Sequence, residues 1–140
     1  MRKFAIWMIL ILFLLNSCQR RRDFSLEQPE DQVVAIEIIC ILTWSGYDPE
    51  NENTFEVQRT IDPVQYDTFL QKLYDVPCYR YFNDPLEGVG KNTIMVSFSD
   101  GSYQLIGEDT VYYETSIGDW EYPRYYFDKE AFDAFLSDFT

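Results

Sequence analysis

Carboxylates and cysteines are the side chains that could carry chemistry in this chain, because its 140 residues include no histidine. That absence excludes Ser/His/Asp and Cys/His nucleophilic centres, and it also excludes histidine-based metal sites. Glu37 is the most notable carboxylate, since it is the only charge in an apolar run. Desolvated acids can serve as catalytic proton donors. The alternative is an acid at the margin of a sheet or beside an arginine, and we predict no catalytic residue.

Two short motifs bear on metal and phosphate binding. Residues 48–53 could present oxygens to calcium, but they lack the spacing and the glycine of an EF-hand loop, so a solvated acidic loop is expected. Residues 88–91 read Gly-Val-Gly-Lys, yet Pro85 stands where a phosphate-binding loop has its first glycine, and Asn92 follows the lysine. The sequence therefore predicts neither a metal nor a cofactor.

Composition and charge argue against two classes of protein, nucleic-acid binding proteins and disordered chains. The chain has 11 basic and 24 acidic residues, a net charge of −13, which argues against a nucleic-acid partner because phosphate binding needs a basic face. Hydrophobic residues make up 46% and aromatics 18%, too much for a disordered chain. The length allows one domain and hardly two.

The N-terminus has the organisation of a secretory signal. Arg2 and Lys3 precede an apolar run over residues 4–15. As a helix this run would span about 18 Å, short of the roughly 30 Å apolar core of a bilayer, so it is a poor permanent anchor. The segment then ends in Leu15-Asn16-Ser17-Cys18.

These four residues resemble the lipobox of bacterial lipoproteins, although Asn16 is a less common choice at its position. The resemblance implies a diacylglyceryl group on the sulfur of Cys18 and cleavage between Ser17 and Cys18. Such a protein is held on the extracytoplasmic face of the cell membrane or the outer membrane. The alternative is an ordinary signal peptide, or an uncleaved anchor, that happens to contain a cysteine.

Removal of residues 1–17 would leave 9 basic and 24 acidic residues, a net charge of −15. Residues 18–32 are then predicted to be the lipidated cysteine and a polar tether. Arg20, Arg21 and Arg22 lie beside the lipid, where they would either contact an anionic surface or remain solvated.

Residues 33–140 are predicted to form a single α+β domain. The β-branched run at residues 33–42 suits a central strand, and residues 54–61 alternate like a strand with one wet side. Shorter strands are expected at residues 79–82, 111–115 and 124–127. In residues 93–107, Asp100-Gly101 predicts a two-residue hairpin turn that pairs Phe98 with Tyr103.

Two helices are expected, each starting at an aspartate, Asp62 and Asp128, because this side chain caps the first free N–H groups. Their apolar stripes lie at i, i+3, i+4 and i+7: Tyr66, Phe69, Leu70 and Leu73 in the first, and Phe132, Phe135, Leu136 and Phe139 in the second. The two segments match at an offset of 66 residues. They are either a repeat whose two units share one sheet or two ordinary capped helices.

Cys40 and Cys78 could form one disulfide, which would stabilise by roughly 3–4 kcal/mol on the chain-entropy account, or they could be two buried thiols. The aromatic stretch over residues 112–127 could be core or contact surface. Its candidate contact residues are Asp119, Trp120, Glu121 and Tyr122, expected in a connecting loop.

Together these observations predict an α+β domain with a mostly antiparallel sheet of five to seven strands and two amphipathic helices on one face. The expected function is that of a membrane-anchored extracytoplasmic lipoprotein with a non-catalytic acidic binding domain. It could be an inhibitor or immunity-type protein against a cationic secreted partner, which the negative charge would steer toward it. The alternative is a structural or assembly component of the cell envelope.

Overall fold

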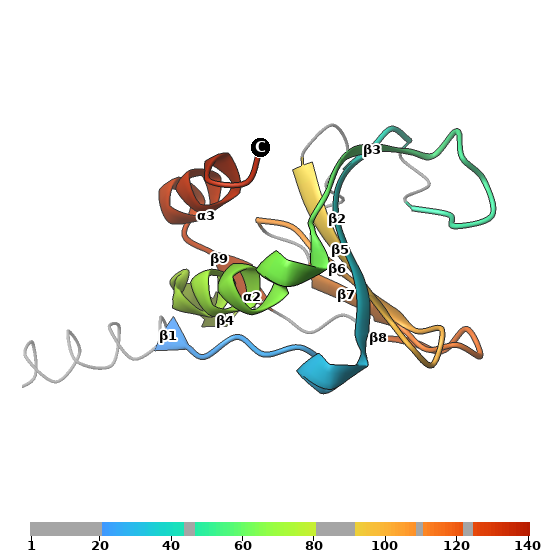
Figure 1. Cartoon of the computed structure of the whole chain (residues 1–140), viewed down its shortest axis with the longest axis horizontal. Helices are drawn as coiled ribbons and strands as arrows, with labels where there is room; N and C mark the ends of the chain where they lie inside the picture. Colours follow the sequence, from blue (N-terminus) through green and yellow to red (C-terminus); the bar gives the residue numbers. More distant parts are fainter. Residues whose placement is uncertain (1–20, 44–46, 81–91, 109–110, 122–124) are drawn as a thin grey trace, which may run out of the picture.

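The computed structural model describes residues 21–43, 47–80, 92–108, 111–121 and 125–140 (Figure 1). The predicted signal segment and Cys18 lie outside these residues. The described residues form the following elements in chain order: β1 (Arg21–Arg22), η1 (Glu30–Gln32), β2 (Val33–Ile41), β3 (Phe55–Thr60), η2 (Pro63–Gln65), α2 (Tyr66–Asp75), β4 (Cys78–Arg80), β5 (Asn92–Phe98), β6 (Tyr103–Ile106), β7 (Val111–Glu114), β8 (Trp120–Glu121), β9 (Tyr125–Phe127) and α3 (Lys129–Ser137).

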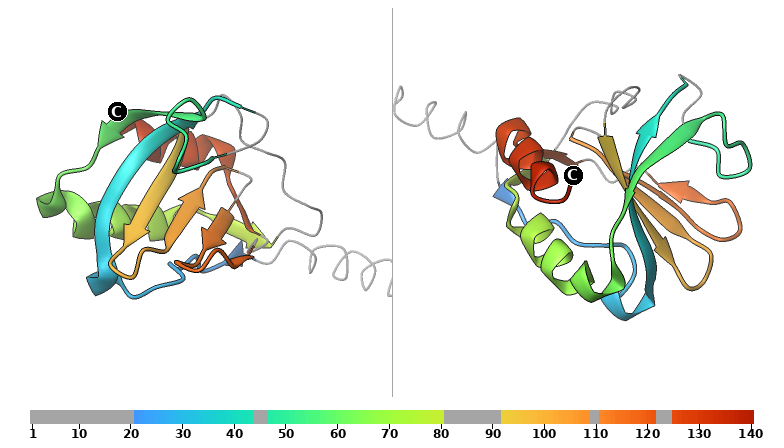
Figure 2. Two further views of the ribbon diagram at one scale, coloured as in Figure 1. Left: turned by 90° about the vertical axis from the view of Figure 1, so that its right-hand side faces the viewer. Right: turned by 45° about the horizontal axis from the view of Figure 1, so that its top comes forward.

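The strands form two antiparallel sheets. The main sheet has the order β3-β2-β5-β6-β7-β8, and a small sheet has the order β1-β4-β9. Figure 2 shows both helices and the small sheet on one face of the main sheet. The predicted α+β class with a mostly antiparallel sheet and two helices is confirmed. The prediction of one sheet is wrong, because the strands next to the helices pair with one another instead of joining the main sheet.

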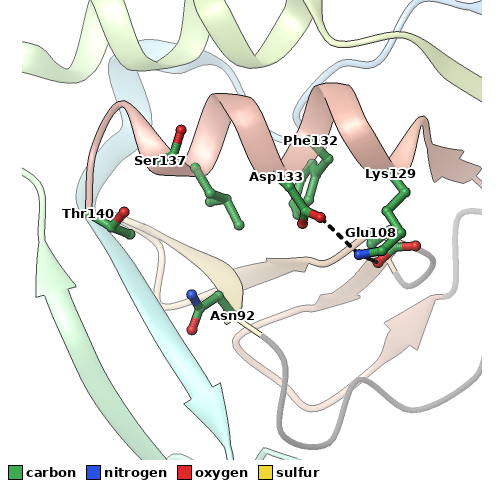
Figure 3. Close-up of a pocket in the computed structure, with 8 residues that line it drawn as sticks. Asn92, Glu108, Lys129, Phe132, Asp133, Ser137 and Thr140 are labelled. Carbon is green, nitrogen blue, oxygen red and sulfur yellow. Dashed lines mark hydrogen bonds and ion pairs between the residues drawn. The ribbon is translucent and has the colours of Figure 1, made fainter.

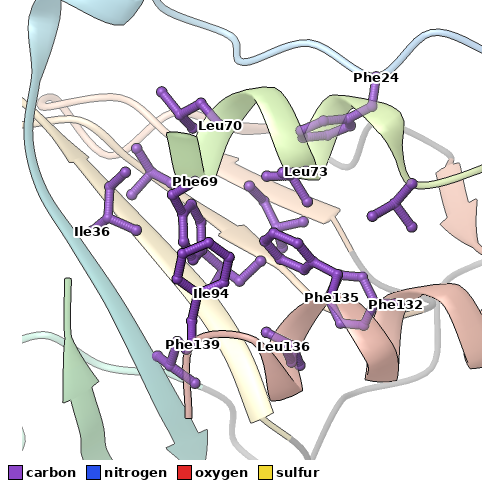
Figure 4. Close-up of a cluster of buried hydrophobic side chains, with 14 of the residues drawn as sticks. Phe24, Ile36, Phe69, Leu70, Leu73, Ile94, Phe132, Phe135, Leu136 and Phe139 are labelled. Atoms are coloured by element: carbon purple, nitrogen blue, oxygen red, sulfur yellow. The ribbon is translucent and has the colours of Figure 1, made fainter. Parts of the chain in front are cut away.

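The core lies between the helices, the small sheet and the inner face of the main sheet (Figure 4). Phe69 of α2 is central to it, with ring centroids 5.0 Å from Phe135 and 4.7 Å from Phe139 in edge-on geometry. Aromatic pairs of this geometry stabilise beyond the area they bury. β2 contributes Ile36 and Ile38 to the core and is buried on both faces, as its apolar run predicts.

Both helices begin at the aspartates that the sequence predicts. The Asp62 carboxylate accepts a hydrogen bond of 3.0 Å from the N–H of Val64, and the Asp128 carboxylate one of 2.9 Å from the N–H of Ala131. The first helix opens with a 3-10 turn, η2, before α2. The strands that precede the two helices lie in different sheets, so the units do not share a sheet as a repeat would require.

The predicted two-residue hairpin turn is wrong by one residue. Residues 99–101 form a three-residue loop, which is closed by a hydrogen bond of 2.9 Å from the N–H of Phe98 to the carbonyl of Ser102. The Asp100 carboxylate accepts from the N–H of Ser102 at 2.9 Å, and Gly101 adopts a φ of +86°. A turn followed by a left-handed glycine is the usual three-residue hairpin. The resulting shift pairs Ser97 with Tyr103 and moves Tyr103 to the face opposite Phe98.

The segment predicted as a polar tether packs onto the domain over residues 21–32. Phe24 is 4% exposed, and its ring centroid lies 5.2 Å from that of Phe127. The N–H of Glu27 donates to the buried side chain of Gln104 at 3.0 Å. β1 pairs with β4 at the edge of the small sheet. The tether prediction therefore fails here, because one buried phenylalanine outweighs the polar composition around it.

Phe24→Ala should lower the free energy of unfolding by about 3–5 kcal/mol, since it removes a buried ring from the core. Denaturant unfolding would measure this loss. The matched control is Ser25→Ala at an exposed neighbouring position, which should change stability little. Equal stability of the two variants would contradict the packing of Phe24 and support the prediction of a solvated tether.

The possible disulfide between Cys40 and Cys78 is not formed in the structure, where both are free thiols. Cys40 is half-buried on β2 of the main sheet, whereas Cys78 lies opposite Phe127 in the small sheet and is 1% exposed. Burial raises the pKa of the Cys78 thiol to about 11, so the reactive thiolate is scarce at neutral pH.

Alkylation of the folded protein at neutral pH should therefore modify Cys40 first and Cys78 only after unfolding. Peptide mass spectrometry after timed labelling would measure both rates. A pair of cysteines that react only after reduction would contradict the structure and establish the disulfide.

Candidate functional site

The second face of the main sheet, directed away from the helices, is the best candidate for a functional surface, and we call it the outer face. Side chains alternate along a strand, so Ile39 and Ile41 of β2 lie here beside Met95 and Leu105. These four residues form a second apolar cluster, and each is at most 8% exposed. The outer face therefore has an apolar floor of its own.

Four half-buried aromatic rings pack against this floor and make an aromatic layer: Tyr47, Phe55, Tyr103 and Tyr112. The centroid of Tyr47 lies 4.8 Å from that of Phe55 and 5.2 Å from that of Tyr103. Tyr103 in turn lies 6.0 Å from Tyr112. The layer thus joins the loop before β3 with β3, β6 and β7 across the sheet.

Carboxylates accompany the aromatic layer. Glu114 of β7 accepts a hydrogen bond of 2.6 Å from the hydroxyl of Tyr103 and another from the hydroxyl of Tyr112. Glu37 of β2 accepts one of 3.3 Å from the hydroxyl of Thr60. Two tyrosine donors on one carboxylate hold Glu114 in a fixed position, as charge-assisted hydrogen bonds do.

The pKa of Tyr47 reflects the negative charge of this surface. Its pKa is raised to about 12, first by burial and then by the negative charges of Glu37, Asp48 and Glu114. The pKa of Tyr103 is raised as well, by burial and by its hydrogen bond to Glu114. Three carboxylates thus act on one hydroxyl group, and the surface around it favours positive charge.

Among the described residues, no basic side chain forms an ion pair with Glu37, Asp48 or Glu114. The ion pairs of this part of the chain join Lys72 to Asp138 at 2.8 Å, and Lys129 to Asp133 at 2.9 Å and Glu108 at 3.4 Å. These lysines belong to the two helices, which cover the inner face. Aromatic rings beside uncompensated carboxylates are suited to hold an ammonium or guanidinium group, through ring faces and hydrogen bonds together.

The predicted contact residues lie at the edge of this surface. Trp120 and Glu121 form strand β8 and not a loop, and the register pairs Trp120 with Glu114 and Glu121 with Tyr113. Asp119 is exposed, and its N–H donates to the hydroxyl of Thr115 at 3.0 Å. Tyr122 lies outside the described residues. The structure therefore places the backbone of Trp120 opposite Glu114, in the edge strand of the main sheet.

Sequence reasoning missed Tyr47 and Tyr103 as site residues. The predicted two-residue turn puts Tyr103 on the face of Phe98, and Tyr47 follows Ser45-Gly46, which are residues typical of turns. Glu37 was singled out for its apolar surroundings, and the structure gives it a half-buried position near Thr60 on the outer face.

The acidic loop at residues 48–53 forms hydrogen bonds within itself. The Asp48 side chain accepts from the N–H of Glu50, and the Asn51 side chain accepts from the N–H of Asn53.

A pocket of about 280 Å³ lies between α3 and the ends of β5 and β6 (Figure 3). Among the described residues, the charged side chains that line it are Lys129, Glu108 and Asp133. Lys129 forms an ion pair with each of the two carboxylates, so both already have a cationic partner within the pocket. The pocket therefore has less to offer a charged ligand than the outer face.

No protein-family model, curated protein or solved structure matches this chain. Within the described residues, no cluster of three potential metal ligands occurs. No helix in that part of the chain is long and apolar enough to cross a bilayer.

The raised tyrosine pKa values predict a loss of stability at alkaline pH. The pKa of Tyr47 rises from 10.0 to about 12 on folding, so between these values the folded state holds a proton that the unfolded state has lost. The free energy of unfolding should fall as the pH rises through this range. Tyr47→Phe should flatten the fall, whereas Glu130→Gln, at an exposed site on α3, should leave it unchanged. Denaturant unfolding at stepped pH would measure both, and identical slopes for wild type and Tyr47→Phe would contradict the assignment.

Proposed function

We propose that this chain is an extracytoplasmic lipoprotein, anchored to a membrane by lipid on Cys18, whose domain is a non-catalytic binding module for a cationic protein. The observation that carries the binding role is the aromatic layer with Glu114 hydrogen-bonded to the hydroxyls of Tyr103 and Tyr112, on a face whose carboxylates have no ion-pair partner among the described residues. An inhibitor or immunity-type protein against a secreted cationic partner is the specific form of this proposal.

The N-terminal sequence supports the anchor. A basic start, a short apolar run and Leu15-Asn16-Ser17-Cys18 are typical of exported lipoproteins. Two acyl chains on one cysteine would hold the domain stably at a bilayer. A binding domain held in this way meets partners that arrive from outside the cytoplasm.

The chemistry of the outer face favours a loop rich in arginine or lysine as the bound element. A guanidinium group is planar, stacks on aromatic rings and binds carboxylates through two parallel hydrogen bonds. Glu114 is held by two tyrosine hydroxyls beside the aromatic layer, so both kinds of contact are available within one surface. The net charge of −15 after cleavage would speed the approach of such a partner at low salt.

Capture from the envelope of the same organism tests the proposal. The full-length lipoprotein in detergent should retain a cationic protein at low salt and release it at moderate salt. The double variant Glu37→Gln/Glu114→Gln should then weaken binding of that purified partner about 10- to 100-fold, or about 1.4–2.8 kcal/mol. Calorimetry or surface plasmon resonance would measure the Kd.

The control is Asp67→Asn/Glu130→Gln, which removes the same charge from exposed positions on α2 and α3. This control should retain most of the affinity, because it leaves the outer face intact. Equal weakening by both double variants would reduce the effect to overall charge and overturn the assigned surface. A partner retained at any salt and by both variants would favour the structural role in the envelope instead.

A further inference from the structure

The small sheet has an inner and an outer side. Cys78 of β4 pairs with Phe127 of β9, and both are buried in the core, at 1% and 2% exposure. The next pair, Tyr79 and Tyr126, therefore points away from the core. Their rings stack at 5.3 Å between centroids and 28° between planes, and both residues are half-buried. The register places Arg21 of β1 opposite Tyr79, at the end of the same row.

Basic residues concentrate around this sheet. Three arginines lie in its strands, and two more stand directly before β1 and β9 in the sequence: Arg21, Arg22 and Arg80, and Arg20 and Arg124. These are five of the nine basic residues that follow the predicted cleavage site. The structure places three of these five in the strands of the sheet, and the other two are next to those strands in the sequence.

The position of Cys18 brings this sheet to the membrane. Three peptide steps separate Cys18 from Arg21 at the start of β1, and an extended chain covers at most about 3.6 Å per residue. A lipid on Cys18 would therefore hold β1 within about 11 Å of the bilayer surface. Because Phe24 anchors the following segment in the core, the domain cannot move away on a longer tether.

We infer that the outer side of the sheet β1-β4-β9 docks on the anionic headgroups of the bilayer that carries the lipid. This docking rests on the proposed anchor at Cys18. Arginine is attracted to anionic headgroups, and tyrosine favours the boundary between headgroups and acyl chains. Arg21, Tyr79 and Tyr126 occupy neighbouring register positions across the three strands. This surface therefore combines the preference of arginine for headgroups with the preference of tyrosine for the boundary region.

The docked orientation agrees with the proposed binding role. The small sheet packs with the helices on the inner face of the main sheet, whereas the aromatic layer covers the outer face. Figure 2 shows β1 beside the helices on one side of the main sheet, and the loop that leads to β3 on the other. A domain resting on its small sheet would therefore direct the aromatic layer away from the bilayer.

Quenching of tryptophan by brominated lipids tests the orientation. The processed lipoprotein would be reconstituted into vesicles of phosphatidylcholine with or without phosphatidylglycerol. The added tryptophan of Tyr79→Trp should be quenched at least about threefold more than that of Ile117→Trp when the anionic lipid is present. Ile117 is 83% exposed in the turn between β7 and β8, which lies far from β1 in Figure 1. Tyr126→Trp provides a second probe if Tyr79→Trp folds poorly.

A charge variant separates docking from anchoring. Arg21→Gln/Arg22→Gln should lose the preferential quenching but still float with the vesicles, since the lipid remains attached. Equal quenching at Tyr79→Trp and Ile117→Trp in protein that floats would overturn the docking and leave the anchor intact. Absence of lipid labelling at Cys18, tested against Cys18→Ala, together with failure to float, would overturn both.

Discussion

The central strand β2 is the constraint on which the structure depends, because it is buried on both faces. Ile36 and Ile38 pack under the helices, whereas Ile39 and Ile41 form the floor of the outer face. A shift of one residue along this strand would exchange the two sets and expose apolar surface on both sides. The inner core and the aromatic layer therefore depend on the same register of β2. Any change in that register would also displace the residues of the candidate site.

The local signals in the sequence predicted much of the fold. Both helices were predicted because an aspartate cap and an apolar stripe are complete within a dozen residues, and β2 was predicted from its β-branched run. The hairpin register was not, since a two-residue turn and the observed three-residue turn both suit Asp100-Gly101. The hydrogen bonds of Asp100 to Ser102 decide between them. The small sheet was missed because it joins three segments from distant parts of the chain.

The candidate site was harder to predict than the fold for the same physical reason. Tyr47, Phe55, Tyr103 and Tyr112 come from four segments, and only the register of the sheet brings their rings together. Composition indicated that acidic and aromatic residues are abundant, but it does not say which of them meet. Trp120 is a candidate because the sequence around it is rich in aromatic residues. Its pairing with Glu114 depends on strand β8, which no local sequence pattern predicts.

The electrostatic arrangement connects the two proposed surfaces. A strongly acidic domain close to an anionic bilayer would be repelled unless positive charge lay between them, and in the proposed orientation Arg21, Arg22 and Arg80 of the small sheet would supply that charge. The screening length at physiological salt is about 8 Å, and a helix layer is about 10 Å thick. Glu37, Asp48 and Glu114 lie beyond that layer, so the charge of a bilayer under the small sheet would reach them only weakly. In the proposed orientation, this separation would let one chain remain next to an anionic membrane while its opposite face attracts a cation.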